Sequence, residues 1–243
     1  MSRLDVYLTE HHIYASRERA KRAVQEGLVS VNGQVVTKAS FEVCEEDTVS
    51  GAKDPVPFVS RGGLKLEGAF AVCSIDVKGC SCLDVGASTG GFTQVLLNRG
   101  AASVTAVDVG HGQLAEELKN DRRVINLEGT DIRNLPEDAC KEAFDFVSID
   151  VSFISLTHVL PCVYSYMKQG GICVALIKPQ FELGRKALNK KGIVKDSRLL
   201  PGAVEAVSDC ALAVGFHVKK VLESPIKGGD GNTEFLLIME KDI

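Results

Sequence analysis

Short apolar runs alternate with segments of helical period in the chain beyond about residue 60. Runs of this length, bounded by turn residues, are typical of strands that are buried on both faces. The expected strands are 81–85, 103–108, 123–127, 145–150, 171–177, 215–222 and 234–240. The alternation predicts an α/β fold, in which helices cover both faces of an open, mostly parallel sheet.

The first 50 residues carry a different pattern. Two short helical patterns, at about 3–11 and 16–26, come before an apolar stretch at 28–36 that is interrupted by Asn32-Gly33. An Asn-Gly pair between two apolar runs is a strong signal for a β-hairpin. Ser16 is placed to cap the second helix. The pattern predicts a small α+β domain.

A linker separates the two parts. Gly51-Ala52-Lys53-Asp54-Pro55-Val56-Pro57 holds two prolines and a glycine, which favour an extended connection over a helix or strand. We therefore expect a small domain at 1–50, a linker at 51–59 and a larger domain at 60–243.

Composition narrows the class of protein. The chain has 243 residues and a formal net charge of −4, and it contains no apolar run near the roughly 18 residues that span a bilayer. Its charged N-terminus lacks the apolar core of a secretory signal, so we expect a cytoplasmic protein. The eight cysteines and five histidines are scattered, so we expect reduced thiols and no metal site.

The segment from Cys82 to Phe92 is the most informative in the chain. An apolar strand ends at Asp84, and a turn of small residues then leads into a helix, with glycines at Gly86, Gly90 and Gly91. Such a turn lets the backbone approach a ligand, and the helix N-terminus offers unpaired N–H groups to it. The alternative is a turn needed only for tight packing. Ser88 stands where the dinucleotide fingerprint requires glycine, which weakens a dehydrogenase interpretation.

Two further acids follow later strands. Asp108 ends the strand 103–108, at the spacing from the glycines where nucleotide-binding folds place an acceptor for ribose hydroxyls. Asp131 follows the third strand and is a further candidate for a ligand contact. A helix cap or a loop residue is the alternative for Asp131, because aspartate is favoured in both settings.

Four charged residues are candidates for catalysis. Lys178 ends an apolar strand and Asp150 ends another, while Lys65 and Glu234 adjoin buried elements. A buried ammonium is costly unless it is paired, and Asp150 is the natural partner of Lys178. A purely structural ion pair at the rim of the sheet is the alternative.

These motifs carry a family resemblance. Asp84-x-Gly86-x-Ser88-x-Gly90-Gly91 resembles the first motif of S-adenosylmethionine-dependent methyltransferases. Lys65, Asp150, Lys178 and Glu234 match in order the catalytic tetrad of the FtsJ-like ribose 2′-O-methyltransferases. The whole chain resembles the TlyA family of rRNA 2′-O-methyltransferases, which is also labelled haemolysin A.

The resemblance implies a Rossmann-like, seven-stranded methyltransferase sheet, S-adenosyl-L-methionine as the cofactor, and transfer of its methyl group to a cytidine 2′-hydroxyl in ribosomal RNA or ribosomal subunits. The implied cofactor contacts are Asp84, Gly86, Ala87, Ser88, Thr89, Gly90, Gly91, Asp108, Val109, Asp131 and Ile132.

The N-terminal domain resembles the ribosomal-protein-S-four type of RNA-binding domain, on residues such as Arg3-Leu4-Asp5, Ser16-Arg17 and Gly27–Gly33. Clustered basic residues, and a basic loop at 184–196, are expected to contact RNA phosphates. The candidates are Arg3, Arg17, Lys21, Arg22, Arg61, Arg185, Lys190 and Lys191. The alternative for both groups is a solvated surface, since residues 1–50 carry a net charge of −2.

Two other functions compete with the methyltransferase. The haemolysin label suggests a membrane-active protein, although the chain shows no spanning segment and no long amphipathic basic helix. A ribosome-binding assembly factor with an inactive core is the other, and the four intact tetrad residues argue against it. The sequence does not specify the target nucleotide, the ribosomal subunit or the oligomeric state.

Overall fold

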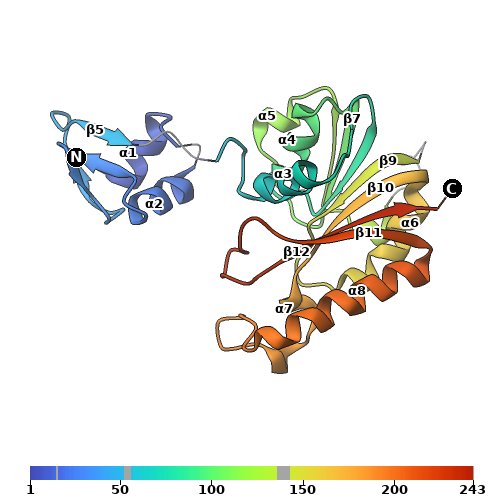
Figure 1. The fold of residues 1–243 in the computed structure, drawn as a ribbon. Helices are drawn as coiled ribbons and strands as arrows, with labels where there is room; N and C mark the ends of the chain where they lie inside the picture. Colours follow the sequence, from blue (N-terminus) through green and yellow to red (C-terminus); the bar gives the residue numbers. More distant parts are fainter. Residues whose placement is uncertain (15, 52–55, 136–142, 243) are drawn as a thin grey trace. The chain divides into compact units, whose positions relative to one another are not determined.

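A computed structural model describes residues 1–14, 16–51, 56–135 and 143–242 (Figure 1). The chain divides into two compact units, Met1–Pro57 and Phe58–Ile243. Residues 52–55 of the expected linker lie outside the described residues, as does Cys140; the described cysteines are free thiols.

The described residues of the first unit form two short helices and five short strands. Both predicted helices and the hairpin are confirmed, since Asn32 and Gly33 turn the chain with φ angles of 52° and 78° and Ser16 accepts a hydrogen bond from the Arg19 N–H. Strands β1, β4 and β5 were not predicted, because two or three residues carry no periodic signal. The elements are β1 Ser2–Arg3, α1 Leu4–Glu10, α2 Arg17–Gln25, β2 Val29–Val31, β3 Gln34–Val35, β4 Glu42–Val43 and β5 Val49–Gly51.

The second unit contains a seven-stranded sheet of order β11-β12-β10-β9-β6-β7-β8, which confirms the seven predicted strands. The strand β12 runs opposite to the other six strands of this sheet. The strands are β6 Ser81–Val85, β7 Ser103–Asp108, β8 Val124–Glu128, β9 Phe144–Ile149, β10 Met167–Ile177, β11 Phe216–Glu223 and β12 Phe235–Lys241. After β6 the chain adds β7 and β8 on one side of that strand, and it then adds β9 and β10 on the other side. The strand order therefore reverses between β6 and β9. In open α/β sheets, ligands bind at such a switch point, beyond the carboxyl ends of the strands.

Helices cover both faces of this sheet. Figure 1 shows α3, α4 and α5 on one side and α6 and α8 on the other. The helices are α3 Gly62–Val72, α4 Gly91–Asn98, α5 Glu116–Lys119, α6 Leu160–Tyr166, α7 Pro179–Glu182 and α8 Leu200–Val214, with 3₁₀ turns η1 Ile132–Asn134, η3 Leu156–His158, η4 Arg185–Ala187 and η5 Ser197–Leu199. Side chains of β6, β9 and β10 pack with those of α6 and α8 in one buried core. Of the helices described, none has the length and apolarity that crossing a membrane requires.

Candidate active site

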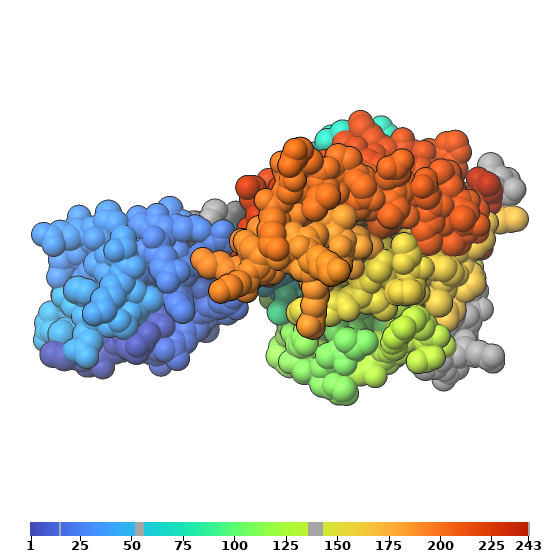
Figure 2. Space-filling model, turned by 90° about the horizontal axis from the view of Figure 1, so that it is seen from below, coloured from blue at the N-terminus to red at the C-terminus, as the bar shows by residue number. Residues whose placement is uncertain are grey.

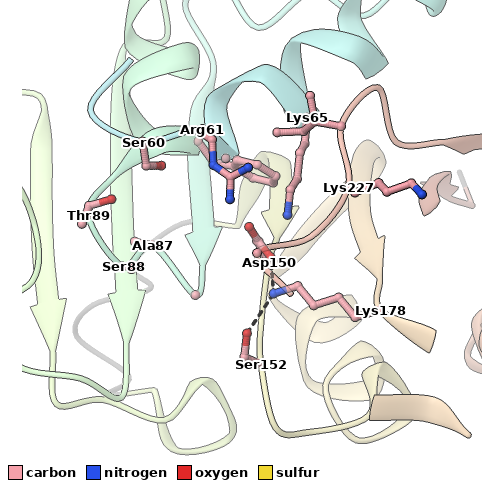
Figure 3. A pocket seen from close by; sticks show the side chains of 16 residues that line it. Ser60, Arg61, Lys65, Ala87, Ser88, Thr89, Asp150, Ser152, Lys178 and Lys227 are labelled. Atoms are coloured by element: carbon pink, nitrogen blue, oxygen red, sulfur yellow. Dashed lines mark hydrogen bonds and ion pairs between the residues drawn. The ribbon is translucent and has the colours of Figure 1, made fainter. Parts of the chain in front are cut away.

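A pocket lies at the switch point, where β6 and β9 end. It brings together segments that are far apart in the sequence (Figure 3). Its lining residues are Ser60, Arg61, Gly62, Lys65, Gly86, Ala87, Ser88, Thr89, Gly91, Phe92, Asp150, Ser152, Lys178, Ile226, Lys227 and Gly229. Three of the four predicted catalytic residues are among them, and the fourth, Glu234, is bonded to one of the three.

Two nearly buried ion pairs organise the pocket. Lys65 Nζ lies 2.6 Å from Glu234 Oε2, and Lys178 Nζ lies 2.7 Å from Asp150 Oδ1. Lys178 Nζ also donates to Ser152 Oγ at 2.8 Å. The predicted pairing of Lys178 with Asp150 is confirmed. In Figure 3, Lys65 and Lys178 point toward Asp150 from different walls of the pocket.

Glycines permit the close backbone packing that forms this pocket. A Cβ on Gly86, which has a φ of +84°, would lie 2.5 Å from the Asp150 carbonyl oxygen. A Cβ on Gly91 would lie 2.2 Å from Ser60 Oγ and 2.9 Å from the Gly63 nitrogen. These two glycines therefore place the turn after β6 against Asp150 and the start of α4 against the segment that leads to Lys65. Packing within the protein therefore requires glycine at both positions, independently of any ligand.

Asp84 lies beneath the pocket and does not line it. Its carboxylate is fully buried and accepts hydrogen bonds from Thr93 Oγ1 at 2.7 Å and Ser148 Oγ at 2.9 Å. Burial outweighs these bonds and raises the pKa of Asp84 to about 6. The side chain joins α4 to β6 and β9, so any effect that it has on a ligand in the pocket is indirect.

Asp84 should make the stability of the protein depend on pH. Its folded-state pKa of about 6 exceeds the ordinary value of 3.8, so its stabilising contribution is complete below about pH 4 and is lost as the pH rises through 6. Relative to Asp84→Asn, the free energy of unfolding of the native protein should fall by roughly 3 kcal/mol over this range. Urea denaturation of both proteins from pH 4 to 7 measures the difference, and parallel curves would contradict it.

Asp108 connects the glycine-rich turn to the loop after β7. Its Oδ2 accepts from the Ser88 N–H at 2.8 Å, and its Oδ1 accepts from the Gly110 N–H at 2.7 Å. Ser88 has a φ of 49°, a conformation that few residues other than glycine adopt. The carboxylate lies at the carboxyl end of β7 and is partly exposed, so it can accept further hydrogen bonds from a ligand.

Asp131 is a helix cap, which was the alternative interpretation of this residue. It caps η1 through the Arg133 N–H and pairs with the Arg133 guanidinium at 2.6 Å, and the bonds to Arg133 lower its pKa. Its neighbour Ile132 is buried, whereas Val109 is largely exposed. A cofactor contact by Asp131, Ile132 or Val109 stays a prediction.

The pocket can hold a polar cofactor that carries both a cationic and an anionic group, the first toward Asp150 and the second toward the N-terminus of α4 and the basic side chains. Asp150 Oδ1 is buried without a hydrogen-bond partner in the described part of the chain, because Lys178 approaches it outside hydrogen-bond alignment. The first turn of α4 presents its N-terminus to the same pocket through Gly91 and Phe92. Across the described ranges, no group of three or more His, Cys, Asp or Glu side chains could hold a metal ion.

Phe153 is a candidate that the sequence pattern did not single out. It lies three residues after Asp150, is 91% exposed, and has a φ of 65°, which is an outlier for a bulky side chain. Its ring centroid lies 5.1 Å from that of Phe181, three residues after Lys178. An apolar residue after a strand carries no special signal, so only the structure reveals its exposure and backbone strain.

Three of the four residues of the first unit that are predicted to contact RNA form ion pairs within that unit. Arg3 and Arg17 both bind the buried carboxylate of Asp5, at 2.9 and 3.0 Å, while Arg22 pairs with Glu26. Arg3 contributes most to lowering the pKa of Asp5 to about 2. The arginine side chains remain about half exposed and Lys21 is exposed, so all four can still meet a phosphate.

The basic loop at 184–196 is an ordered part of the second unit, and it belongs to the orange surface in Figure 2. Leu188 and Val194 form a β-bridge across it. The buried Asn232 accepts from the Val194 N–H and donates to the Gly192 carbonyl oxygen, both at 3.0 Å. Arg185, Lys190 and Lys191 are exposed on this anchored loop, whereas Arg61 lines the pocket.

The fold and pocket define a Rossmann-like methyltransferase. A Listeria monocytogenes S-adenosylmethionine-dependent methyltransferase superposes on 75% of this chain with a TM-score of 0.57, and the chain covers all of that structure; at 16% identity this likeness supports the fold alone. The FtsJ-like methyltransferase model matches residues 58–241, and an S4 domain matches residues 2–49. The chain belongs to the FtsJ-like methyltransferase family, and S-adenosylmethionine is its cofactor.

Relatives match nearly the whole chain. The 16S/23S rRNA (cytidine-2′-O)-methyltransferase TlyA of Mycobacterium tuberculosis is 41% identical over 97% of this chain and 88% of its own length. Hemolysin A of Brachyspira hyodysenteriae is 38% identical over 96% and 98%. A solved structure from Streptococcus thermophilus, described under the hemolysin label, is 43% identical and has a TM-score of 0.80, covering 99% of this chain and 88% of that one.

Proposed function

We propose that this protein transfers a methyl group from S-adenosylmethionine to the 2′-hydroxyl of a cytidine in ribosomal RNA, and that it does so in the cytoplasm. The observation that carries the proposal is the pair of lysine–carboxylate contacts, Lys65 with Glu234 and Lys178 with Asp150, at the switch-point pocket. The relative named for this activity matches 97% of the chain.

The bound cofactor supplies a methyl group on a positively charged sulfur. Lys178 has the central task among the protein's residues, because its Nζ is fixed by Asp150 and Ser152 at the pocket wall. There it would orient the ribose hydroxyl and relay its proton, because Nζ can take up the hydroxyl proton as one of its own protons passes to the Asp150 carboxylate. Holding the hydroxyl in line with the methyl group supplies much of the rate. Glu234 holds Lys65 in a fixed position beside them.

The surroundings of Lys178 suit a nucleotide that is turned out of its stack. The exposed ring of Phe153 offers a flat apolar face beside Ser152, and aromatic side chains commonly stack on splayed bases. Arg61 and Lys227 line the same pocket and bring positive charge toward the phosphates. The S4 domain and the basic loop supply further phosphate contacts.

Asp108 should contribute to cofactor affinity by accepting the ribose hydroxyls of S-adenosylmethionine. The Asp108→Ala change removes a charged acceptor, at a cost of about 1.5 to 3 kcal/mol, so Kd should rise roughly 10- to 150-fold. Calorimetry measures this change. Asp209→Ala, which removes an exposed carboxylate from α8, is the matched control and should leave Kd unchanged. An unchanged Kd in Asp108→Ala would remove this residue from the cofactor site.

Ribosomes test the substrate assignment directly. Intact ribosomes and separated subunits from a strain that lacks the protein are incubated with it and methyl-labelled cofactor, and the modified nucleotide is mapped. We expect label on the 2′-oxygen of a cytidine. Label on a base, or no label in any rRNA when cofactor binding is demonstrated by calorimetry, would overturn the proposal.

A further inference from the structure

The turn that follows Asp150 is held in a strained conformation. Phe153 adopts the left-handed region, which is unfavourable for a bulky side chain and persists only when the surrounding contacts impose it. Phe153 is 91% exposed, so burial of its side chain does not offset the unfavourable conformation. The contacts that impose the conformation must therefore act on neighbouring residues.

Ile154 packs against the buried core, and the side-chain hydrogen bonds on either side of Phe153 come from a single short segment, Lys178–Glu182. Before Phe153, Lys178 Nζ donates to Ser152 Oγ at 2.8 Å. After it, the Glu182 carboxylate accepts from Ser155 Oγ at 2.5 Å and from the Leu156 N–H at 3.0 Å. Beside it, Phe181 contacts the Phe153 ring. The strained residue is thus fixed on both sides by one segment that also carries the proposed catalytic lysine.

Glu182 uses both of its carboxylate oxygens in this way. Oε1 binds the backbone and Oε2 binds a side chain, and Ser155 Oγ in turn caps η3 by accepting from the Thr157 N–H at 3.1 Å. Hydrogen bonds to a charged acceptor are about twice as strong as neutral ones. Glu182 lies at the end of α7 and reaches the turn without entering the pocket lining.

We propose that Glu182 is a positioning residue that holds the turn 152–156 in its strained form and so presents the Phe153 ring to the target nucleotide beside Lys178. The use of the ring by the substrate rests on the proposed function, whereas the hold on the turn does not. Without Glu182 the turn should relax, and the conformation that is ready for RNA becomes a minor one. The apparent affinity for RNA then falls in proportion to the fraction of molecules whose turn keeps the binding conformation.

Four substitutions test this role and separate it from a general effect of charge. Glu182→Ala removes both acceptors. Glu182→Gln keeps an amide oxygen for the Leu156 N–H and offers an N–H to Ser155 Oγ, so it should restore the hold. Glu205→Ala removes an exposed carboxylate from α8 and is the matched control. Ser155→Ala removes one of the two bonds, and we expect it to have an intermediate effect; it also serves as the test if Glu182→Ala fails to fold.

A fluorescence measurement tests the hold without requiring catalysis. The chain contains no tryptophan, so Phe153→Trp in the full-length protein provides a single reporter at the turn. Adding Glu182→Ala should lower the anisotropy of the introduced indole, while Glu182→Gln and Glu205→Ala should leave it unchanged. An unchanged anisotropy with Glu182→Ala would overturn the proposal.

Methylation kinetics, with Phe153 in place, test the consequence for RNA. Glu182→Ala should raise KM for the ribosomal substrate about tenfold, with the cofactor Kd unchanged, and Glu182→Gln should restore KM to within about twofold of the native value. An unchanged KM in Glu182→Ala would overturn the role in RNA presentation even if the anisotropy falls. Failure of the proposed function is distinguishable, because the unsubstituted protein would then label no rRNA at all.

Discussion

Replacing Lys178 with alanine should abolish methyl transfer while leaving S-adenosylmethionine binding nearly intact. Lys178 is the lysine whose Nζ is fixed by both a carboxylate and a hydroxyl at the pocket, at 2.7 Å from Asp150 Oδ1 and 2.8 Å from Ser152 Oγ. A positioned proton-transfer group contributes roughly 10²- to 10⁴-fold to a rate. The loss of positioning adds to this, since the hydroxyl would no longer be held in line.

Single-turnover labelling of ribosomal substrate at saturating cofactor measures the chemical step, and calorimetry measures cofactor binding. Lys219→Ala is the matched control, because it removes a lysine that is also paired with a carboxylate, Glu240, but lies on β11 and is half exposed. We expect no change in its rate. A Lys178→Ala protein that turns over at more than about a tenth of the native rate would exclude Lys178 from the chemistry.

The fold could be predicted from the sequence because its signals are local. The central strands of the large sheet carry short apolar runs, whereas the edge strands β8 and β11 are partly polar and exposed. The boundaries at Ser81–Val85 and Ser103–Asp108 match the prediction to the residue. The hairpin was predicted for the same reason, since Asn32-Gly33 specifies its turn. Strands β1 and β4 could not be predicted, because their formation depends on pairing with each other across about 40 residues.

The candidate site was predictable only in part, because its contacts are not local. The Lys178–Asp150 pair follows from two buried strands that end at the same edge of the sheet. The Lys65–Glu234 pair joins residues 169 positions apart, and only the family resemblance indicated it. The ion pairs of Arg3 and Arg17 with Asp5 were not predicted, because a cluster of basic residues in the sequence does not show which acid of the domain it faces.

A fragment of residues 58–243 should fold and bind S-adenosylmethionine but methylate ribosomes at less than about a hundredth of the native rate. Every member of the large buried core, from Leu83 to Met239, lies within this fragment, and so do all the residues that line the pocket. The lost unit carries the S4 domain and its basic helix. Phosphate contacts position a protein on RNA, so their removal should act on RNA affinity and leave the cofactor site unaffected.

Substitution of the basic helix in the full chain should reproduce much of this loss. We choose the double variant Lys21→Ala/Arg22→Ala and leave Arg17 in place. Arg17 also binds the buried Asp5 carboxylate, so its removal would lower the stability of the domain. Each lost phosphate contact should reduce the slope of log affinity against log salt by about 0.7 to 0.9. Lys219→Ala should keep the native slope. If the double variant also keeps it, or if the fragment methylates ribosomes at the full rate, the helix is only a solvated face and the RNA is held elsewhere.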